Sequence, residues 1–179
     1  GSPRPKGSTA AVAAEVAKGA ATAGAEVETA FLHGLKVAPC NGCNACQRNG
    51  GRCVIEDDMQ ALYPTVRAAD ALVIASPVYW FTLSAQTKLF LDRCYCLIAD
   101  DALRGKRIGV VLTYGGADVF SSGGVNALRA LQDTCAFAGA KIVGMVYGAG
   151  GDPAAMAQNS SLLQDACQLG RDVAAPEPA

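Results

Sequence analysis

Four cysteines lie close together in one short segment of the sequence. Cys40, Cys43, Cys46 and Cys53 follow the pattern C-x2-C-x2-C-x6-C. Three thiolates at this spacing can surround one side of a small metal centre, and the fourth can complete its coordination. Zinc also accepts four thiolates, and four reduced thiols without a metal are the third reading. The spacing therefore predicts a metal site but leaves the metal open.

A second group of polar residues opens the chain. Residues 1–9 (GSPRPKGST) are rich in glycine and hydroxyls and precede an alanine-rich stretch, residues 10–21, that favours a helix. Amide groups at a helix start, hydroxyl groups and a guanidinium can together bind a phosphate. The side chains concerned are those of Ser2, Arg4, Ser8 and Thr9. A flexible terminus is the alternative reading.

Two further segments follow apolar runs that we predict to be strands. The run at 71–75 (ALVIA) leads into Pro77, Val78, Tyr79 and Trp80. Aromatic residues make up only 6% of the chain, so their clustering suggests a surface for a planar ligand, with a core plug as the alternative. The run at 108–113 leads into a segment with two glycines that allow close backbone approach. Its residues are Thr113, Tyr114, Gly115 and Gly116.

The order of elements predicts how these segments are positioned. Apolar runs at 71–75, 108–113 and 142–147 alternate with helical patterns, which is typical of a parallel sheet covered by helices. We expect the three strands to be buried on both faces, and residues 27–31 to add a half-exposed edge strand. The carboxyl ends of parallel strands meet at one edge, so the candidate segments can converge on one crevice.

Helix starts are signalled by two aspartates. Asp58 can cap a helix whose inner face contains Met59 and Val66, and Asp152 before Pro153 is expected to start the last helix. Residues 174–179 are proline-rich and are predicted to be a flexible tail.

The remaining candidates receive plain readings. Asp92 and Arg93 are expected to form an ion pair on a helix surface or to help an oligomer interface. His33 is expected at the surface or an interface, and residues 148–151 (GAGG) lack a dinucleotide-binding pattern. The other four cysteines are expected to be small packing residues, with the first two on different helix faces: Cys94, Cys96, Cys135 and Cys167.

In combination, these segments resemble a known family. GSPRPKGST, PCNGCNACQRNGGRCVIEDDM and SPVYWFTLSAQTKLFLDR, in this order, are similar to the NAD(P)H-dependent FMN oxidoreductases of the flavodoxin-like superfamily, most closely to the iron-sulfur flavoproteins. The resemblance runs from Gly1 to about Gly116. It implies a three-layer α/β fold with sheet order 2-1-3-4-5, FMN as cofactor, NAD(P)H as electron donor, and a homodimer or homotetramer.

The same resemblance assigns roles to the candidate residues. Ser2, Arg4, Ser8 and Thr9 would hold the FMN phosphate. Pro77, Val78, Tyr79 and Trp80 would flank the ribityl chain and the isoalloxazine, and residues 113–116 would border the ring's other edge. Beside these flavin loops, a 4Fe-4S cluster is the favoured occupant of the four cysteines. No side chain is expected to act as a catalytic acid or base, because the flavin supplies the redox chemistry.

The family has an apolar strand immediately before the GSPR segment, and this sequence begins at that segment. Strand 1 is central in the order 2-1-3-4-5, so its neighbours would lack ladder partners without it. We therefore expect residues upstream of Gly1 in the natural protein. The domain is expected to cover residues 1–173, with a cysteine-rich insertion at 39–58.

Composition limits the partners. The net charge of −1 and a sequence pI of about 5.8 give no basic surplus for nucleic acid or anionic lipid. With no long apolar stretch and no leader segment, we expect a cytoplasmic protein without membrane contact.

Three functions remain open. The first is an enzyme that oxidises NAD(P)H and reduces a quinone, a flavin or another small acceptor. The second is an electron-transfer module that works with a ferredoxin-like carrier, and the third is an FMN-dependent biosynthetic dehydrogenase.

Overall fold

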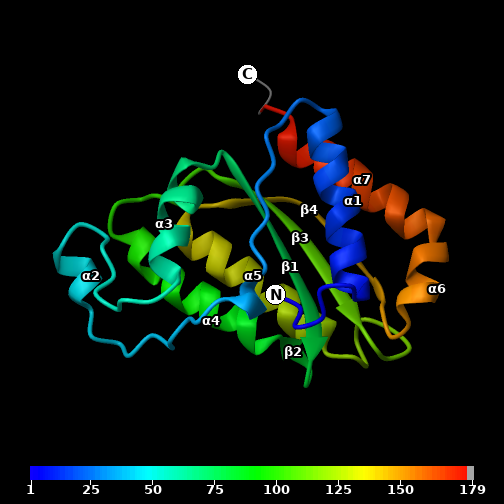
Figure 1. The fold of residues 1–179 in the computed structure, drawn as a ribbon, viewed down its shortest axis with the longest axis horizontal. Helices are drawn as coiled ribbons and strands as arrows, with labels where there is room; N and C mark the ends of the chain where they lie inside the picture. The colour runs from blue at the N-terminus through cyan, green and yellow to red at the C-terminus, as the bar shows by residue number, and fades with distance from the viewer. Residues whose placement is uncertain (177–179) are drawn as a thin grey trace.

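The three apolar runs form parallel strands in a four-stranded sheet of order β2-β1-β3-β4. This computed structural model describes residues 1–176 (Figure 1). β1 (Ala71–Tyr79), β3 (Arg107–Tyr114) and β4 (Lys141–Ala149) are each longer than the predicted run. Their order matches the last three strands of the predicted sheet. β2 (Thr82–Leu83), which the sequence did not predict, pairs antiparallel with the end of β1.

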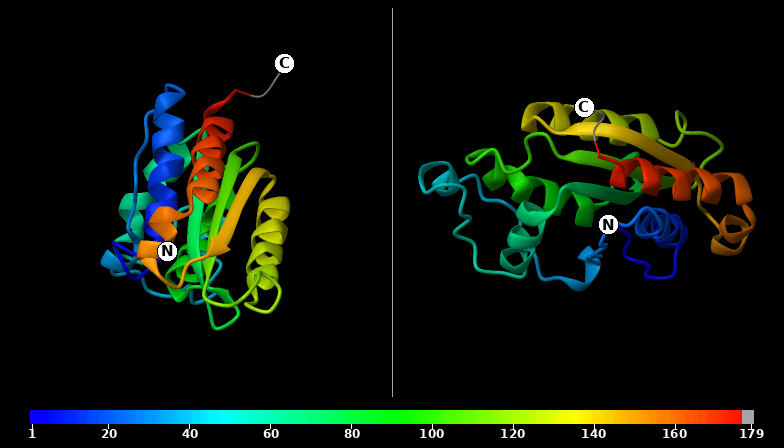
Figure 2. Two further views of the ribbon diagram at one scale, coloured as in Figure 1. Left: turned by 90° about the vertical axis from the view of Figure 1, so that its right-hand side faces the viewer. Right: turned by 90° about the horizontal axis from the view of Figure 1, so that it is seen from above.

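Helices cover both faces of this sheet. Figure 2 shows α1 and α7 on one face and α5 on the other, so the fold has three layers. The helices are α1 (Ser8–Thr22), α2 (Ala45–Arg48), α3 (Met59–Ala68), α4 (Ala85–Arg93), α5 (Gly124–Ala138), α6 (Pro153–Gln158) and α7 (Ser160–Ala174), with short 3-10 helices η1 (Leu32–Gly34) and η2 (Cys94–Ile98). In the described residues, no helix is both long and apolar enough to cross a bilayer.

β3 shows how the sequence builds the two faces of the core. Successive side chains of a strand point to opposite faces. Val111 packs with Val12 of α1 in one core cluster, whereas Val110 packs with Leu131 of α5 in another. β3 is buried almost throughout because it has helices on both faces and a strand on each side.

The contact between α1 and α7 depends on two glycines. A Cβ atom at Gly19 would lie 1.9 Å from the Cys167 carbonyl oxygen, and one at Gly170 would lie 2.0 Å from the Val16 carbonyl oxygen. The absence of side chains at these positions therefore lets the two helix backbones approach closely.

Two strand predictions are wrong. Residues 27–31 form no strand, because no described strand is adjacent to offer ladder partners. The prediction that all three strands are buried on both faces holds only for β3. β1 and β4 lie nearer the sheet edges, and Val73 and Tyr147 are 39% and 43% exposed. Along Ala71–Pro77, β1 pairs with β3 alone among residues 1–176, and the strand predicted upstream of Gly1 stays a prediction.

The helix starts are partly as predicted. Asp152 accepts a hydrogen bond from the Ala154 N–H at 2.9 Å, but it begins the short α6 and α7 follows as the last helix. Asp58 precedes α3 without capping it, since its carboxylate accepts from the Lys36 N–H. The Met59 N–H donates to Asp57 instead. α7 ends at Ala174, inside the predicted tail, and residues 177–179 of that tail lie outside the described residues.

Candidate functional site

The carboxyl ends of the parallel strands bring two of the predicted segments side by side. Pro77 of β1 is the register partner of Thr113 of β3, and Thr113 is in turn the partner of Gly148 of β4. Residues 76–81, 113–116 and 148–151 therefore leave the same edge of the sheet. This is the edge at which open α/β sheets bind ligands.

The first loop joins this edge through two buried hydroxyl groups. The Oγ1 atoms of Thr9 and Thr113 are 2.6 Å apart, and the Ser8 hydroxyl donates to the Gly150 carbonyl oxygen at 2.8 Å. Ser8, Thr9 and Thr113 are each less than 5% exposed. The start of α1 is thus fixed against the ends of β3 and β4.

Gly150 is a site residue that sequence reasoning missed. Its N–H donates to the Tyr114 carbonyl oxygen at 2.7 Å. A Cβ atom at this position would lie 2.7 Å from the Thr113 Cβ and 3.0 Å from the Ser8 Cβ, so only glycine fits between the two loops. The sequence did offer one indication of this role: Gly150 lies just after a predicted strand, although GAGG lacks a dinucleotide-binding pattern.

The first loop also contains an exposed cation and leads into a helix start without a side-chain cap. The buried Ser2 hydroxyl accepts from the Arg4 N–H at 3.1 Å and so shapes the turn, while Arg4 itself is exposed. Gly7 is the residue before α1, and no side chain caps the helix start. An uncapped helix start offers N–H donors and partial positive charge to an anion.

A buried hydroxyl network anchors the beginning of this loop. The Ser84 hydroxyl lies 2.6 Å from the Gly1 carbonyl oxygen and 2.9 Å from the Thr87 hydroxyl, and the Ser84 N–H donates to Ser76. The Gly1 amino group donates to the Ala75 carbonyl oxygen at 2.7 Å. The first loop is therefore held at its start by β1 and α4 and at its end by β3 and β4.

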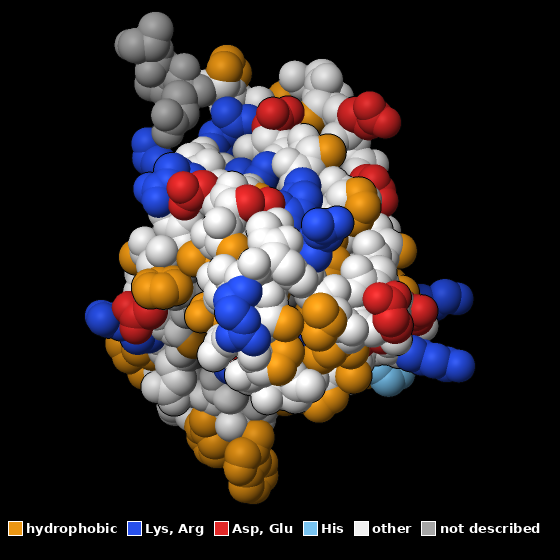
Figure 3. Space-filling model, turned by 90° about the vertical axis from the view of Figure 1, so that its left-hand side faces the viewer, with side chains coloured by type: hydrophobic (Ala, Val, Ile, Leu, Met, Phe, Trp, Pro, Cys, Tyr) orange, Lys and Arg blue, Asp and Glu red, His pale blue; other side chains and the backbone are white. Residues whose placement is uncertain are grey.

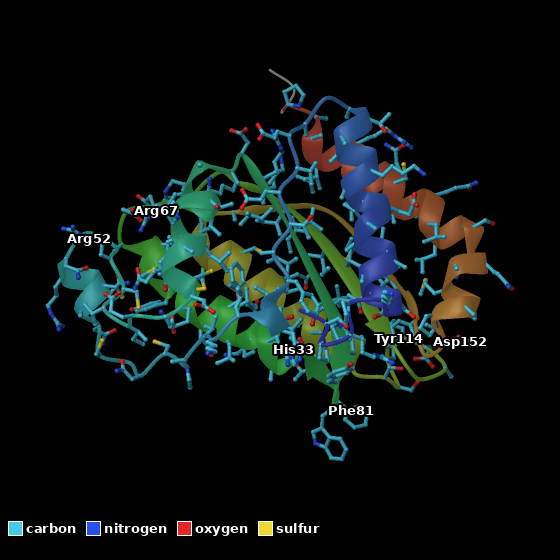
Figure 4. All side chains as sticks on the ribbon, viewed as in Figure 1. His33, Arg52, Arg67, Phe81, Tyr114 and Asp152 are labelled. Atoms are coloured by element: carbon cyan, nitrogen blue, oxygen red, sulfur yellow. The ribbon has the colours of Figure 1, made fainter. Side chains whose placement is uncertain are left out.

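The aromatic cluster forms the tip of the β1–β2 hairpin. Trp80 and Phe81 have φ values of 47° and 66°, in the left-handed region that bulky residues avoid. They are 92% and 55% exposed, so the alternative reading as a core plug is wrong. Figure 4 shows Phe81 projecting beyond the end of the sheet, and Figure 3 shows an apolar projection at the same end. Asn126 Nδ2 braces the turn by donating to the Phe81 carbonyl oxygen at 3.1 Å.

The four predicted metal ligands also come together. Cys40, Cys43, Cys46 and Cys53 line one pocket, with Tyr95 at its wall. The first two are exposed and the last two are half-buried. Within residues 1–176, no three cysteine, histidine or carboxylate side chains are already grouped closely enough to hold a metal ion. The loop therefore places four thiols around one space.

Polar and charged groups act on the Cys53 thiol. Burial opposes its ionisation, but hydrogen bonds from the Ile55 N–H and the Tyr63 hydroxyl, together with the nearby Arg93 guanidinium, outweigh it and lower the pKa of Cys53. A lowered pKa favours the thiolate, which is the form that binds metals.

One prediction about the residues near these cysteines is wrong. Arg93 forms no surface ion pair with Asp92. Its guanidinium is fully buried and pairs with Asp57, while Asp92 pairs with Lys88 on the exposed side of α4. Cys94 and Cys96 of η2 are both buried in one core cluster, which confirms the prediction that they are packing residues. Cys96 lies in the same core cluster as Tyr63, and Cys46 and Cys53 pack against this cluster.

The two candidate centres lie at different places in the molecule. Figure 4 shows Arg52 of the cysteine-rich insertion at one end of the view and Tyr114 and Asp152 at the other. The insertion and α6 are also at opposite ends in both Figure 1 and the right-hand view of Figure 2.

Known iron-sulfur flavoproteins resemble much of this chain in sequence. One from Methanosarcina thermophila is 36% identical over 132 residues, 74% of this chain and 66% of that protein. Another from Methanocaldococcus jannaschii is 38% identical over 111 residues, 62% of this chain and 57% of that protein. The matches thus span less than two thirds of these relatives.

A solved structure gives the fold, and a family model gives the family. The NAD(P)H:quinone oxidoreductase from Methanothermobacter marburgensis superposes with a TM-score of 0.73 and 18% identity, covering 99% of this chain and 95% of that one. At this identity the likeness shows the fold alone, which is flavodoxin-like. The model described as NADPH-dependent FMN reductase matches residues 1–154. The chain therefore belongs to the NADPH-dependent FMN reductase family.

Proposed function

We propose that this protein is an FMN-dependent oxidoreductase that takes electrons from NAD(P)H and delivers them to a small acceptor such as a quinone or a flavin. The observation that carries the proposal is the joining of the first loop to the carboxyl ends of β3 and β4 through Thr9, Thr113 and Gly150. Open parallel sheets bind cofactors at this edge. Family membership supports FMN as the ligand.

The phosphate of FMN would lie over the start of α1. Arg4 and the uncapped amide groups would hold it there. Ser8 donates its hydroxyl proton to Gly150, so its hydroxyl and that of Thr9 would position the loop, while Ser2 shapes the turn. This divides the four predicted phosphate residues into one direct ligand and three that fix the geometry.

The ring system would lie between the aromatic hairpin and the loop after β3. Pro77, Val78, Tyr79 and Trp80 would flank it on one side, and Thr113, Tyr114, Gly115 and Gly116 would border the other. FMN supplies hydride acceptance and release of single electrons when it is bound. The chain's contribution is to hold the ring, to exclude water from part of it and to leave one face open for NAD(P)H.

The cysteine pocket supports a second role, in which the protein exchanges single electrons with a ferredoxin-like partner. We propose that Cys40, Cys43, Cys46 and Cys53 hold a 4Fe-4S cluster. Four thiols around one pocket fit this donor set, and the relatives' names support iron over zinc. Metal binding would order the loop, since metal sites commonly form as their ligands close on the ion. Assembly as a homodimer or homotetramer and a cytoplasmic location are part of the same proposal.

An anaerobic spectroscopic experiment tests these roles. The purified protein, supplied with FMN, iron and sulfide, is assayed for bound flavin and iron and is then mixed with NADH, NADPH or reduced ferredoxin. Rapid loss of flavin absorbance with NAD(P)H is the expected result for the enzyme. Reduction by ferredoxin alone would favour the electron-transfer role. Bound zinc in place of iron would contradict the cluster, and no bound flavin would contradict both roles.

A further inference from the structure

We propose that Arg93 is a positioning residue of the cysteine pocket. Its side chain closes the base of the cysteine loop, residues 40–53, and its buried positive charge beside Cys53 sets the redox potential of the cluster. The part that concerns the potential rests on the 4Fe-4S cluster proposed above. The part that concerns loop closure rests on contacts in the protein alone.

Arg93 bridges the two ends of the cysteine loop. Its Nη1 donates to the Ala38 carbonyl oxygen at 2.9 Å, and its Nη2 donates to the Ile55 carbonyl oxygen at 3.3 Å. Ala38 lies two residues before Cys40, and Ile55 lies two residues after Cys53. The Arg93 side chain, at the end of α4, therefore binds the backbone on both sides of the segment that contains all four thiols.

Asp57 completes this closure. Its two carboxylate oxygens accept from Nη1 and Nη2 of Arg93 at 2.5 and 3.1 Å, which is the forked geometry that arginine offers to a carboxylate. The same carboxylate accepts from the Ala38 N–H at 2.8 Å and the Met59 N–H at 3.0 Å. The Arg93 side chain is fully buried and that of Asp57 is 10% exposed.

Because Arg93 is buried, water and salt screen its positive charge only weakly. Charges inside a protein are screened much less than charges at its surface. Arg67, an arginine outside the loop, donates to the Gly51 carbonyl oxygen and pairs with Asp100, but its side chain is 29% exposed. Arg93 donates to the Ile55 carbonyl oxygen, two residues after Cys53, and its charge acts on the Cys53 thiol. A positive charge beside a ligand stabilises the more negative, reduced form of a cluster, so Arg93 should raise its reduction potential.

Two variants that each remove one charge separate this role from a merely structural one. Arg93→Met removes the positive charge, and Asp57→Asn removes its counter-charge while keeping the carboxylate's shape. Both disturb the same closure, so a structural role would move the midpoint potential in one direction or leave it unchanged. The proposed role moves the potential in opposite directions: down for Arg93→Met and up for Asp57→Asn.

The potentials are measured by redox titration of cluster-loaded protein, followed by electron paramagnetic resonance. Arg93→Lys keeps the charge, so its midpoint potential should stay closer to that of the wild type than the potential of Arg93→Met. The lysine variant also replaces the methionine variant in this comparison if the latter does not fold. Leu131→Ala is the control, since Leu131 of α5 is buried in a separate core cluster and its loss destabilises the fold without touching the loop. Its potential should be unchanged. Shifts of Arg93→Met and Asp57→Asn in the same direction, or no shift in either, would overturn the proposal.

Loop closure is measured on cluster-free protein by the alkylation rate of each cysteine, read by mass spectrometry. Arg93→Met and Arg93→Lys should speed alkylation of Cys46 by about tenfold or more, because local opening that is easier by about 1.4 kcal/mol exposes it ten times as often. Leu131→Ala should react like the wild type. Wild-type rates in both Arg93 variants would overturn the closure. A wild-type protein that takes up no iron would overturn the cluster and the claim about its potential, and the alkylation rates would still decide the closure.

Discussion

The hydroxyl groups of Thr9 and Thr113 lie 2.6 Å apart, and both side chains are buried. They come from the first turn of α1 and from the end of β3, which are separated by more than a hundred residues in the chain. One hydroxyl donates to the other, so each satisfies its partner inside the core. This contact fixes the proposed phosphate-binding loop to the edge of the sheet.

Replacing Thr113 with valine should loosen that loop. Thr113→Val keeps the branched shape but leaves the Thr9 hydroxyl without its partner, which should lower the free energy of unfolding by about 1–3 kcal/mol. FMN should also bind more weakly. Thr134→Val, at an exposed threonine that bonds back to its own helix, is the matched control. Denaturant unfolding and FMN titration measure both effects, and equal values for the two variants would contradict the role of the contact.

Gly150 should tolerate no side chain. Gly150→Ala places a Cβ atom 2.7 Å from the Thr113 Cβ and 3.0 Å from the Ser8 Cβ, so one of the loops has to move. Overpacking of this kind costs about 1–3 kcal/mol. Gly151→Ala, where nothing lies within 4 Å of the new atom, is the control. FMN affinity should fall for the first variant and stay near wild type for the second. Unchanged affinity in Gly150→Ala would show that the loop junction is not needed.

The strained backbone at the tip of the β1–β2 hairpin should lower the stability of the protein and support FMN binding. Phe81 has a φ of 66°, and a left-handed conformation costs a bulky residue about 1–2 kcal/mol, part of which glycine recovers. Phe81→Gly should therefore be as stable as the wild type or more stable, yet bind FMN more weakly if this tip contacts the flavin. Asp101→Gly relieves a φ of 54° away from the site and should leave FMN binding unchanged. A Phe81→Gly protein with wild-type FMN affinity would remove the hairpin tip from the proposed site.

Arg4 should discriminate between FMN and riboflavin. Arg4→Met removes an exposed cation beside the uncapped start of α1. A charge-assisted contact with phosphate contributes about 1.5–3 kcal/mol, so FMN should bind at least about tenfold more weakly while riboflavin affinity is unchanged. Arg104→Met, at a 67% exposed arginine, is the control. Equal losses for both flavins in Arg4→Met would contradict a phosphate contact.

The Asp57 carboxylate should make the protein sensitive to acid. Burial opposes its ionisation, but hydrogen bonds from Arg93 and from the Ala38 and Met59 N–H groups outweigh it and hold the pKa of Asp57 below its ordinary value. The resulting stabilisation is complete above the unfolded pKa of about 3.9 and is lost as the pH falls through the lower native value. Asp57→Asn should therefore flatten the fall in unfolding free energy below about pH 5. Asp133→Asn, at a 61% exposed carboxylate, should keep the wild-type slope, and a wild-type slope in Asp57→Asn would contradict this assignment.

The sequence predicted the parts of the fold that depend on local pattern. Runs of apolar β-branched residues marked β1, β3 and β4, and their parallel pairing placed the segments after Pro77 and Thr113 at one edge. Alternation at residues 27–31 misled the prediction, because a strand also needs a neighbour with which to pair. Local pattern states what a segment can form, and tertiary contacts decide whether it does.

The missed residues share a different cause, since their roles come from distant partners. From the sequence, Arg93 is expected at the surface of a helix. In the structure it is buried and pairs with Asp57, which lies 36 positions earlier in the chain. Gly150 looks like an ordinary loop glycine until Ser8 and Thr113 are packed against it. Neither residue carries a local motif, so only the folded arrangement reveals them.

Flavin binding through the phosphate can be measured directly. Flavin-free protein is titrated with FMN and with riboflavin, and binding is followed by quenching of flavin fluorescence. We expect saturation at about one FMN per chain and weaker binding of riboflavin, which lacks the phosphate that the loop before α1 would hold. No quenching by FMN, or equal affinity for the two flavins, would contradict a flavin held by its phosphate at the carboxyl edge of this sheet.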